Sequence, residues 1–147
     1  MNGGGPIRAA IVCPGRGSYG RTELGSLSAA RAAGPSPRLD AMLAALDERR
    51  AARGLEPLLA LDTAPRFSAR THLRADNASA LILAGAAADL DLVEEAVRTR
   101  RIEPVVVCGN SLGWYTALWV AGALDTARAA RLVDTMAALQ VERGVEG

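Results

Sequence analysis

The chain has 147 residues, of which 50% are hydrophobic and 22% charged, and its formal net charge is +1. This composition suits one globular domain with a sizeable apolar core and excludes a disordered chain. The basic residues are all arginine and are scattered along the sequence, and no apolar run could span a bilayer, so we expect a cytoplasmic protein that binds neither nucleic acid nor membranes.

The first expected element is a buried strand at residues 7–13, preceded by a disordered segment at 1–6. The run "IRAAIVC" is small, apolar and β-branched. The loop that follows, "CPGRGSYG", carries Gly15, Gly17 and Gly20 in the GxGxxG spacing of a dinucleotide-binding turn. That spacing allows the backbone to approach a phosphate closely, so a nucleotide site has to be considered.

The rest of the chain argues against a nucleotide site. A dinucleotide fold needs a second strand soon after the turn, ending in an acidic residue that binds the ribose. The acidic residue at the right distance is Asp40. It falls in the clearest predicted helix, at residues 36–53, where Ser36 is the expected cap and Pro37 the first helical residue. We therefore favour another function for the glycine loop.

The middle of the chain is predicted to be helical after a loop at residues 61–74, which lacks periodicity. Asp76 can cap a helix that runs to about Ala88. Asp89 and Asp91 then indicate a break, and a second helical stretch reaches residue 100.

The C-terminal part begins with a short buried strand, "PVVVCG", at residues 104–109. A helix follows from Ser111, Gly122 can terminate it, and Asp125 can cap the last helix. Strands that alternate with helices predict an α/β fold with a mainly parallel sheet.

Each predicted strand ends in or near a cysteine, Cys13 in the first and Cys108 in the second. Both are expected to be buried and reduced, without a disulfide. We find no metal-ligand spacing and predict neither a metal nor a cofactor.

The second glycine motif carries the chemistry. The sequence "GNSLG" is a GxSxG motif formed by Gly109, Ser111 and Gly113, with a strand before it and a helix after it. This is the context of a nucleophile elbow, in which a serine on a sharp turn projects its hydroxyl near a helix N-terminus. A serine that only caps the helix is the structural alternative. We favour a nucleophilic serine because both flanking elements are present.

An acyl-transferring serine also needs two backbone N–H groups that bind the carbonyl oxygen. One usually comes from the residue after the nucleophile, here Leu112, and the other from a loop after a neighbouring strand. The loop "CPGRGSYG" is well placed to supply the second.

Together, "CPGRGSYG" and "GNSLGWYTALWVAGALD" resemble the FPGQGSQ and GHSLGEYSALVAAGALD segments of malonyl-CoA:acyl carrier protein transacylases and of the acyltransferase domains of fatty-acid and polyketide synthases. The resemblance implies an α/β-hydrolase-like core and transfer of a short acyl group from coenzyme A, through Ser111, to an acyl carrier protein. By position, Arg16 and Leu112 would provide the two backbone N–H groups of the oxyanion hole.

Three candidate substrate-binding positions depart from the family pattern. Asn110 replaces the usual histidine before the serine, and Trp114 replaces the glutamate that opens the helix. Met136 falls where malonyl-specific members carry an arginine that pairs with the malonyl carboxylate. Because methionine cannot form that ion pair, we expect uncharged short acyl groups such as acetyl to be accepted at least as well as malonyl, unless another arginine replaces the missing one. Packing in the core explains Met136 equally well.

The resemblance covers only the N-terminal portion of the family. In the family the catalytic histidine lies downstream, beyond an inserted ferredoxin-like domain. The resemblance therefore implies that residues 1–147 are the N-terminal part of an acyltransferase catalytic domain, as a truncated product, a fragment or one part of a split enzyme. The one histidine here, His72, is expected in an exposed loop and not to act as the base. A serine hydrolase that uses the same elbow, and a non-catalytic remnant that binds acyl-CoA, are the alternatives.

Overall fold

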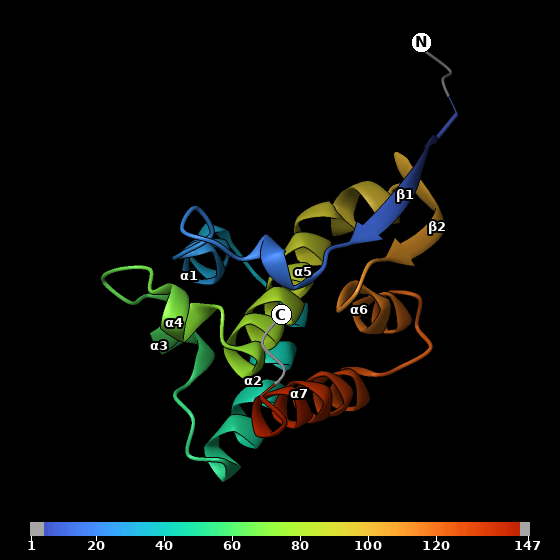
Figure 1. Cartoon of the computed structure of the whole chain (residues 1–147). Helices are drawn as coiled ribbons and strands as arrows, with labels where there is room; N and C mark the ends of the chain where they lie inside the picture. Colours follow the sequence, from blue (N-terminus) through green and yellow to red (C-terminus); the bar gives the residue numbers. More distant parts are fainter. Residues whose placement is uncertain (1–4, 145–147) are drawn as a thin grey trace.

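The computed structural model describes residues 5–144 of the chain as a mixed α/β structure (Figure 1). A two-stranded sheet lies at one side of a group of helices. The elements, in order, are β1 (Ile7–Cys13), η1 (Arg16–Ser18), α1 (Ser26–Ala33), α2 (Pro37–Ala52), α3 (Leu58–Asp62), α4 (Ala69–His72), α5 (Ala75–Arg98), β2 (Ile102–Gly109), α6 (Gly113–Val120) and α7 (Thr126–Glu142).

The expected disorder at residues 1–6 falls mostly on residues 1–4, which lie outside the described residues. Gly5 and Pro6 are described, and both are exposed ahead of β1.

The strands β1 and β2 pair in parallel, as predicted, with Ile7 opposite Ile102 at one end and Cys13 opposite Gly109 at the other. The pairing shifts between Ala9 and Ala10, opposite Pro104. Proline has no N–H to donate to the sheet, which accounts for the irregularity at this point. The carboxyl ends of both strands therefore lie at the same edge.

The prediction that these strands are buried is wrong. Ile7 is 70% exposed and Val12 is 68% exposed, and Cys108 is exposed while Cys13 is buried. The helix that contacts both strands is α6. Buried β-branched strands are typical of parallel sheets that have helices on both faces, and this two-stranded sheet lacks such cover among the residues that the structure describes. Both cysteines are free, as expected.

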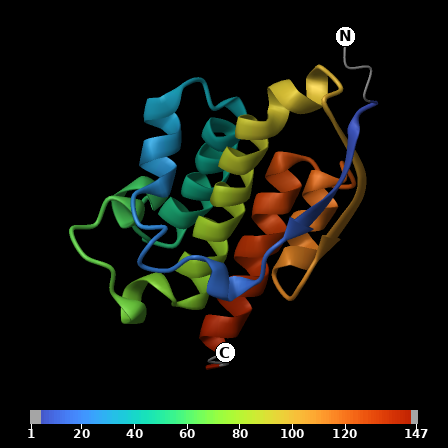
Figure 2. The same ribbon diagram turned by 90° about the horizontal axis from the view of Figure 1, so that it is seen from above.

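The apolar core lies among the helices rather than on the sheet. The long helix α5 contacts α2 and α7, which also contact each other, and Figure 2 shows α5 running through the middle of this group. Its leucine- and alanine-rich face is fully buried, including Leu81 and Leu83. None of the described helices is long and apolar enough to cross a membrane.

The predicted break at Asp89 and Asp91 is wrong, because α5 continues through both residues to Arg98. The Asp91 carboxylate instead accepts hydrogen bonds from the backbone N–H groups of Arg38 and Leu39, at the first turn of α2. Ser36 occupies the N-cap position of α2 but makes no side-chain capping bond. A residue of α5 therefore caps a different helix.

The segment at residues 61–74 is also more ordered than predicted, since it contains the end of α3 and all of α4. Helix α1 was not predicted at all. The final helix agrees with the sequence: the Asp125 side chain accepts a hydrogen bond of 2.7 Å from the Arg128 N–H.

A buried carboxylate, Asp62, joins the N-terminal segment to α3. Its Oδ1 accepts hydrogen bonds from the Tyr19 hydroxyl at 2.9 Å and from the Gly25 and Leu27 N–H groups, and its Oδ2 accepts one from Ser28 at 2.9 Å. The Asp62 side chain thus caps the first turn of α1 from another element. Burial, together with this hydrogen bond to Asp62, raises the pKa of Tyr19, which stays protonated and donates.

We predict that Asp62→Asn lowers the free energy of unfolding by about 2–3 kcal/mol, because an amide NH2 cannot accept the bonds that the carboxylate accepts. Urea unfolding measures this loss. The matched control is Asp40→Asn, which removes an exposed ion pair with Arg31 and should cost less than about 1 kcal/mol. Equal losses in the two variants would contradict the capping role of Asp62.

Candidate active site

Ser111 lies in the tight turn between the end of β2 and the start of α6. Its φ angle is 53°, in the left-handed region that residues with a side chain rarely adopt. The Asn110 carbonyl accepts a bond of 2.8 Å from Gly113, and the Ser111 carbonyl accepts one of 3.1 Å from Trp114. A strained serine that the surrounding backbone holds in place is a feature of functional sites.

The two glycines that flank Ser111 are required by close backbone packing. A Cβ atom on Gly113 would lie 2.0 Å from the Cys13 carbonyl oxygen, and one on Gly109 would lie 2.2 Å from the Gly113 oxygen. Both distances are far below van der Waals contact. The GxSxG spacing therefore reflects the approach of α6 to the ends of the two strands.

The first glycine loop lies against Ser111, as predicted. The Asn110 N–H donates to the Cys13 carbonyl at 3.3 Å. A Cβ on Gly15 would lie 3.5 Å from the Cβ of Ser111. Arg16 begins η1 and Leu112 is the N-cap of α6, positions where a helix leaves its own N–H groups unused. Both residues proposed for the oxyanion hole therefore stand at the start of a helix, and both line the same cavity as Ser111.

A cavity of about 280 Å³ opens beside Ser111. Four other predicted site residues line it: Arg16, Leu112, Trp114 and Met136. Asn110, the remaining predicted site residue, does not line the cavity. It is exposed, and its backbone hydrogen bonds close the turn between β2 and α6.

Sequence reasoning missed the other residues that line this cavity. Three of them lie on α7 together with the predicted Met136, three or four residues apart and so on one face of the helix: Val133, Ala137 and Gln140. That spacing, read forward from Met136, could have found Gln140. Ser79 of α5 also lines the cavity, and nothing in its sequence surroundings indicated this.

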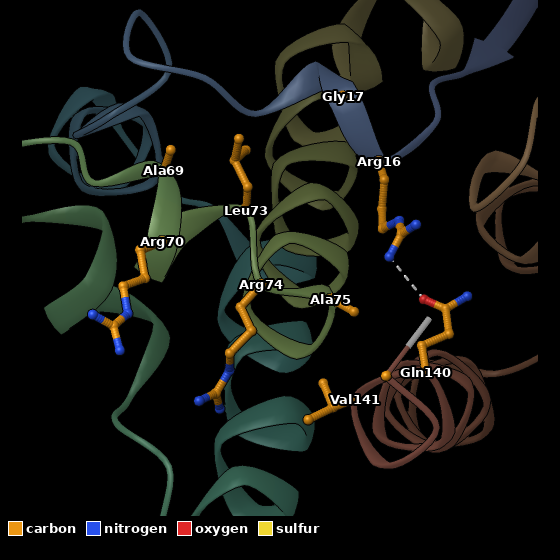
Figure 3. Close-up of a pocket in the computed structure, with 10 residues that line it drawn as sticks. Arg16, Gly17, Ala69, Arg70, Leu73, Arg74, Ala75, Gln140 and Val141 are labelled. Carbon is orange, nitrogen blue, oxygen red and sulfur yellow. Dashed lines mark hydrogen bonds between the residues drawn. The ribbon is translucent and has the colours of Figure 1, made fainter. Parts of the chain in front are cut away.

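A larger cavity of about 690 Å³ shares Arg16 and Gln140 with the first. Figure 3 shows the Arg16 side chain reaching from η1 towards α7, where its Nη1 donates to Oε1 of Gln140 at 2.9 Å. Arg70 and Arg74 line the same larger cavity. The Arg74 guanidinium forms two hydrogen bonds of 2.7 Å to the Asp76 carboxylate, so its charge already has a partner.

The prediction that His72 lies exposed in a loop is wrong, because it is 1% exposed and ends α4. Its ring stacks on Phe67 with ring centres 4.9 Å apart. Its Nδ1 lies 3.0 Å from the Ser68 N–H and its Nε2 lies 3.1 Å from the Leu61 carbonyl. With a proton on Nε2, the ring donates to the Leu61 carbonyl and accepts from the Ser68 N–H through Nδ1. These backbone contacts occupy both nitrogens, and that His72 is not the base stays a prediction.

Cys13, which ends β1 near Ser111, is a poor nucleophile. Burial, and to a lesser degree the neighbouring Cys108, raises the pKa of the Cys13 thiol. A thiol with a raised pKa holds little thiolate near neutral pH. Among the residues that the structure describes, no group of three His, Cys, Asp or Glu side chains is placed to hold a metal ion.

Of three comparisons with known proteins, one found a similar structure. No family model matches the chain, and no curated protein matches it significantly. The fold is similar to that of an acyl carrier protein S-malonyltransferase. That crystal structure, from Vibrio cholerae, has a TM-score of 0.63 and 27% sequence identity to this chain. The match covers 89% of this chain and 38% of the malonyltransferase chain, so the described fold corresponds to part of that enzyme.

We predict that Gly113→Ala lowers the free energy of unfolding by about 2–3 kcal/mol, because the new methyl group forces α6 away from Cys13. Thermal or urea unfolding gives the value. Gly85→Ala is the matched control: nothing lies within 4 Å of a Cβ at this position of α5. There alanine should stabilise the helix by up to about 1 kcal/mol. A Gly113→Ala variant as stable as the unaltered chain would contradict the close packing of the turn.

Proposed function

We propose that the chain carries the nucleophile portion of a serine acyltransferase, in which Ser111 takes an acyl group from a coenzyme A thioester and passes it to an acyl carrier protein. The observation that carries this proposal is the strained turn of Ser111, with φ of 53°, packed against the loop that begins at Gly15. The similarity to the malonyltransferase supports the same class of reaction.

The proposed reaction has two steps. The Ser111 oxygen attacks the thioester carbonyl, its proton leaves to a base, and the carbon–sulfur bond breaks to release the coenzyme A thiol. The thiol of the carrier protein then attacks the serine ester and restores the hydroxyl. Negative charge develops on the carbonyl oxygen in both steps, and the N–H groups of Arg16 and Leu112 are proposed to bind it.

The general base is proposed to come from outside residues 5–144. His72, the one histidine of the sequence, holds backbone groups with both ring nitrogens. A serine hydroxyl is a weak nucleophile until a base accepts its proton, and such a base contributes about 10²–10⁴-fold to the rate. The chain by itself should therefore acylate slowly, and a downstream segment bearing a histidine should restore transfer.

The two cavities suggest how a thioester would enter. The small cavity beside Ser111 suits a short acyl group, while the larger one, which adjoins it through Arg16 and Gln140, has room for the long arm that carries the thioester. Both coenzyme A and an acyl carrier protein end in such an arm, which is consistent with one entrance for donor and acceptor.

We predict that the 147-residue chain, incubated with malonyl-CoA, gains the mass of one acyl group, and that Ser111→Ala does not. Intact-mass spectrometry followed by peptide mapping detects the modification and locates it. Ser26→Ala, an exposed serine at the start of α1, is the matched control and should label as the unaltered chain does.

Two outcomes would contradict the proposal: label that persists in Ser111→Ala, or a chain that is never labelled even with a histidine-bearing downstream segment present. A label on Ser111 that water removes, but that a carrier protein never accepts, would instead assign the chain to the serine hydrolases.

A further inference from the structure

The lining of the small cavity beside Ser111 includes a deeply buried polar side chain, that of Ser79 on α5. Ser79 is only 3% exposed. Its neighbours along the helix are apolar and equally buried: Ala78, Ala80 and Leu81. A hydroxyl in such surroundings gives up its hydrogen bonds to water, which is unfavourable unless another group replaces them. The partner of the Ser79 hydroxyl therefore has to be identified.

The chain itself supplies no such partner within residues 5–144. A serine or threonine on a helix can donate to the carbonyl four residues before it. Thr63 and Thr99 do so, at 2.7 and 2.6 Å, whereas the Ser79 hydroxyl forms no hydrogen bond with a described residue. Thr116 Oγ1 also lacks a partner there, but it is shut off from solvent and Thr116 does not line the cavity. The Ser79 hydroxyl is thus an unpaired polar group beside the cavity.

The position of Ser79 indicates which part of a substrate would contact it. Ser79 lines the small cavity but not the larger one, whereas Arg16 and Gln140 line both. Arg16 and Gln140 also bond to each other at 2.9 Å, so they mark the place where the two cavities adjoin (Figure 3). The thioester arm is proposed to occupy the larger cavity, with the acyl carbonyl at Ser111. The acyl chain is then the part that shares the small cavity with Ser79.

The other walls of the small cavity fit a carbon chain. Six of the lining residues are apolar or aromatic: Leu112, Trp114, Tyr115, Val133, Met136 and Ala137. Against these walls the Ser79 hydroxyl can donate one hydrogen bond and accept others. A plain alkyl chain would displace water from this hydroxyl and leave it unpaired, whereas an oxygen atom on the chain would pair with it.

We propose that Ser79 selects short acyl groups that carry an uncharged oxygen substituent, a hydroxyl or a keto group, over plain alkyl acyl groups of the same length. The inference rests on the proposed function of Ser111. A site that forms a hydrogen bond with a substituent discriminates against the analogue that lacks it, because the analogue leaves a buried polar group unpaired. Ser79 takes no part in the transfer itself and acts on the choice of acyl group.

The proposal is tested by equilibrium binding to the Ser111→Ala chain, which cannot be acylated at that position. The probes are the butyryl, 2-hydroxybutyryl and 3-hydroxybutyryl thioesters of N-acetylcysteamine, with each enantiomer measured separately by isothermal titration calorimetry. We expect the best hydroxylated probe to bind about threefold to tenfold more tightly than butyryl, which is the usual net effect of one hydrogen bond. Adding Ser79→Ala should reverse this order, because the probe's hydroxyl then enters an apolar cavity without a partner.

Thr116→Val is the matched control, since it also removes a hydroxyl without a partner in the described chain, but outside the cavity lining, and should leave the preference intact. The fold should tolerate Ser79→Ala, because alanine favours helices and no hydrogen bond within residues 5–144 is lost. Its melting temperature should equal or exceed that of the Ser111→Ala parent.

Three results would overturn the proposal: butyryl binding as tightly as every hydroxylated probe, a preference that survives Ser79→Ala, or no binding of any probe. A lower melting temperature for Ser79→Ala would also overturn it, because the hydroxyl would then have a structural partner in the chain. Failure of the Ser111 proposal is separately visible as absence of mass labelling in the unaltered chain, which this binding measurement does not require.

Discussion

The pairing of β1 with β2 at their carboxyl ends is the contact on which the candidate site depends. Cys13 lies opposite Gly109, and the Cys13 carbonyl approaches Gly113 so closely that no side chain fits between them. Because the strands are parallel, the loop after each one leaves from the same edge. This places Gly15 against Ser111 although the two are distant in sequence, and it gives the chain both of its proposed oxyanion donors.

The helices complete the site by fixing α7 across from this edge. Arg49 and Arg53 of α2 both bind Asp134 of α7, and Asp134 is 8% exposed. Breaking such a half-buried pair leaves a charge without its partner, which costs more than the loss of a surface ion pair. Met136 and Gln140, which line the cavity beside Ser111, follow Asp134 on the same helix.

Local patterns in the sequence predicted the elements that bear the site, while features that depend on distant partners were missed. The bounds of β1, the first residue of α2 at Pro37 and the Asp125 cap all follow from neighbouring residues. Asp91, together with Asp89, was predicted to mark a break between two helices. In the fold Asp91 caps α2 instead, and no local pattern shows that partner. Burial of His72 likewise depends on Phe67 and on the Leu61 carbonyl. The exposure of the strands could not be predicted, since β-branched runs normally indicate cover on both faces.

The central claim is that Ser111 and the two loops beside it form one acyl-transfer centre. A crystal structure of the chain after reaction with a malonyl thioester tests this most directly, because it locates the acyl group and its carbonyl oxygen together. The account predicts an ester on the Ser111 oxygen, with the carbonyl oxygen within about 3 Å of the N–H groups of both Arg16 and Leu112. An acyl group on another residue, or a carbonyl oxygen directed away from both N–H groups, would contradict it.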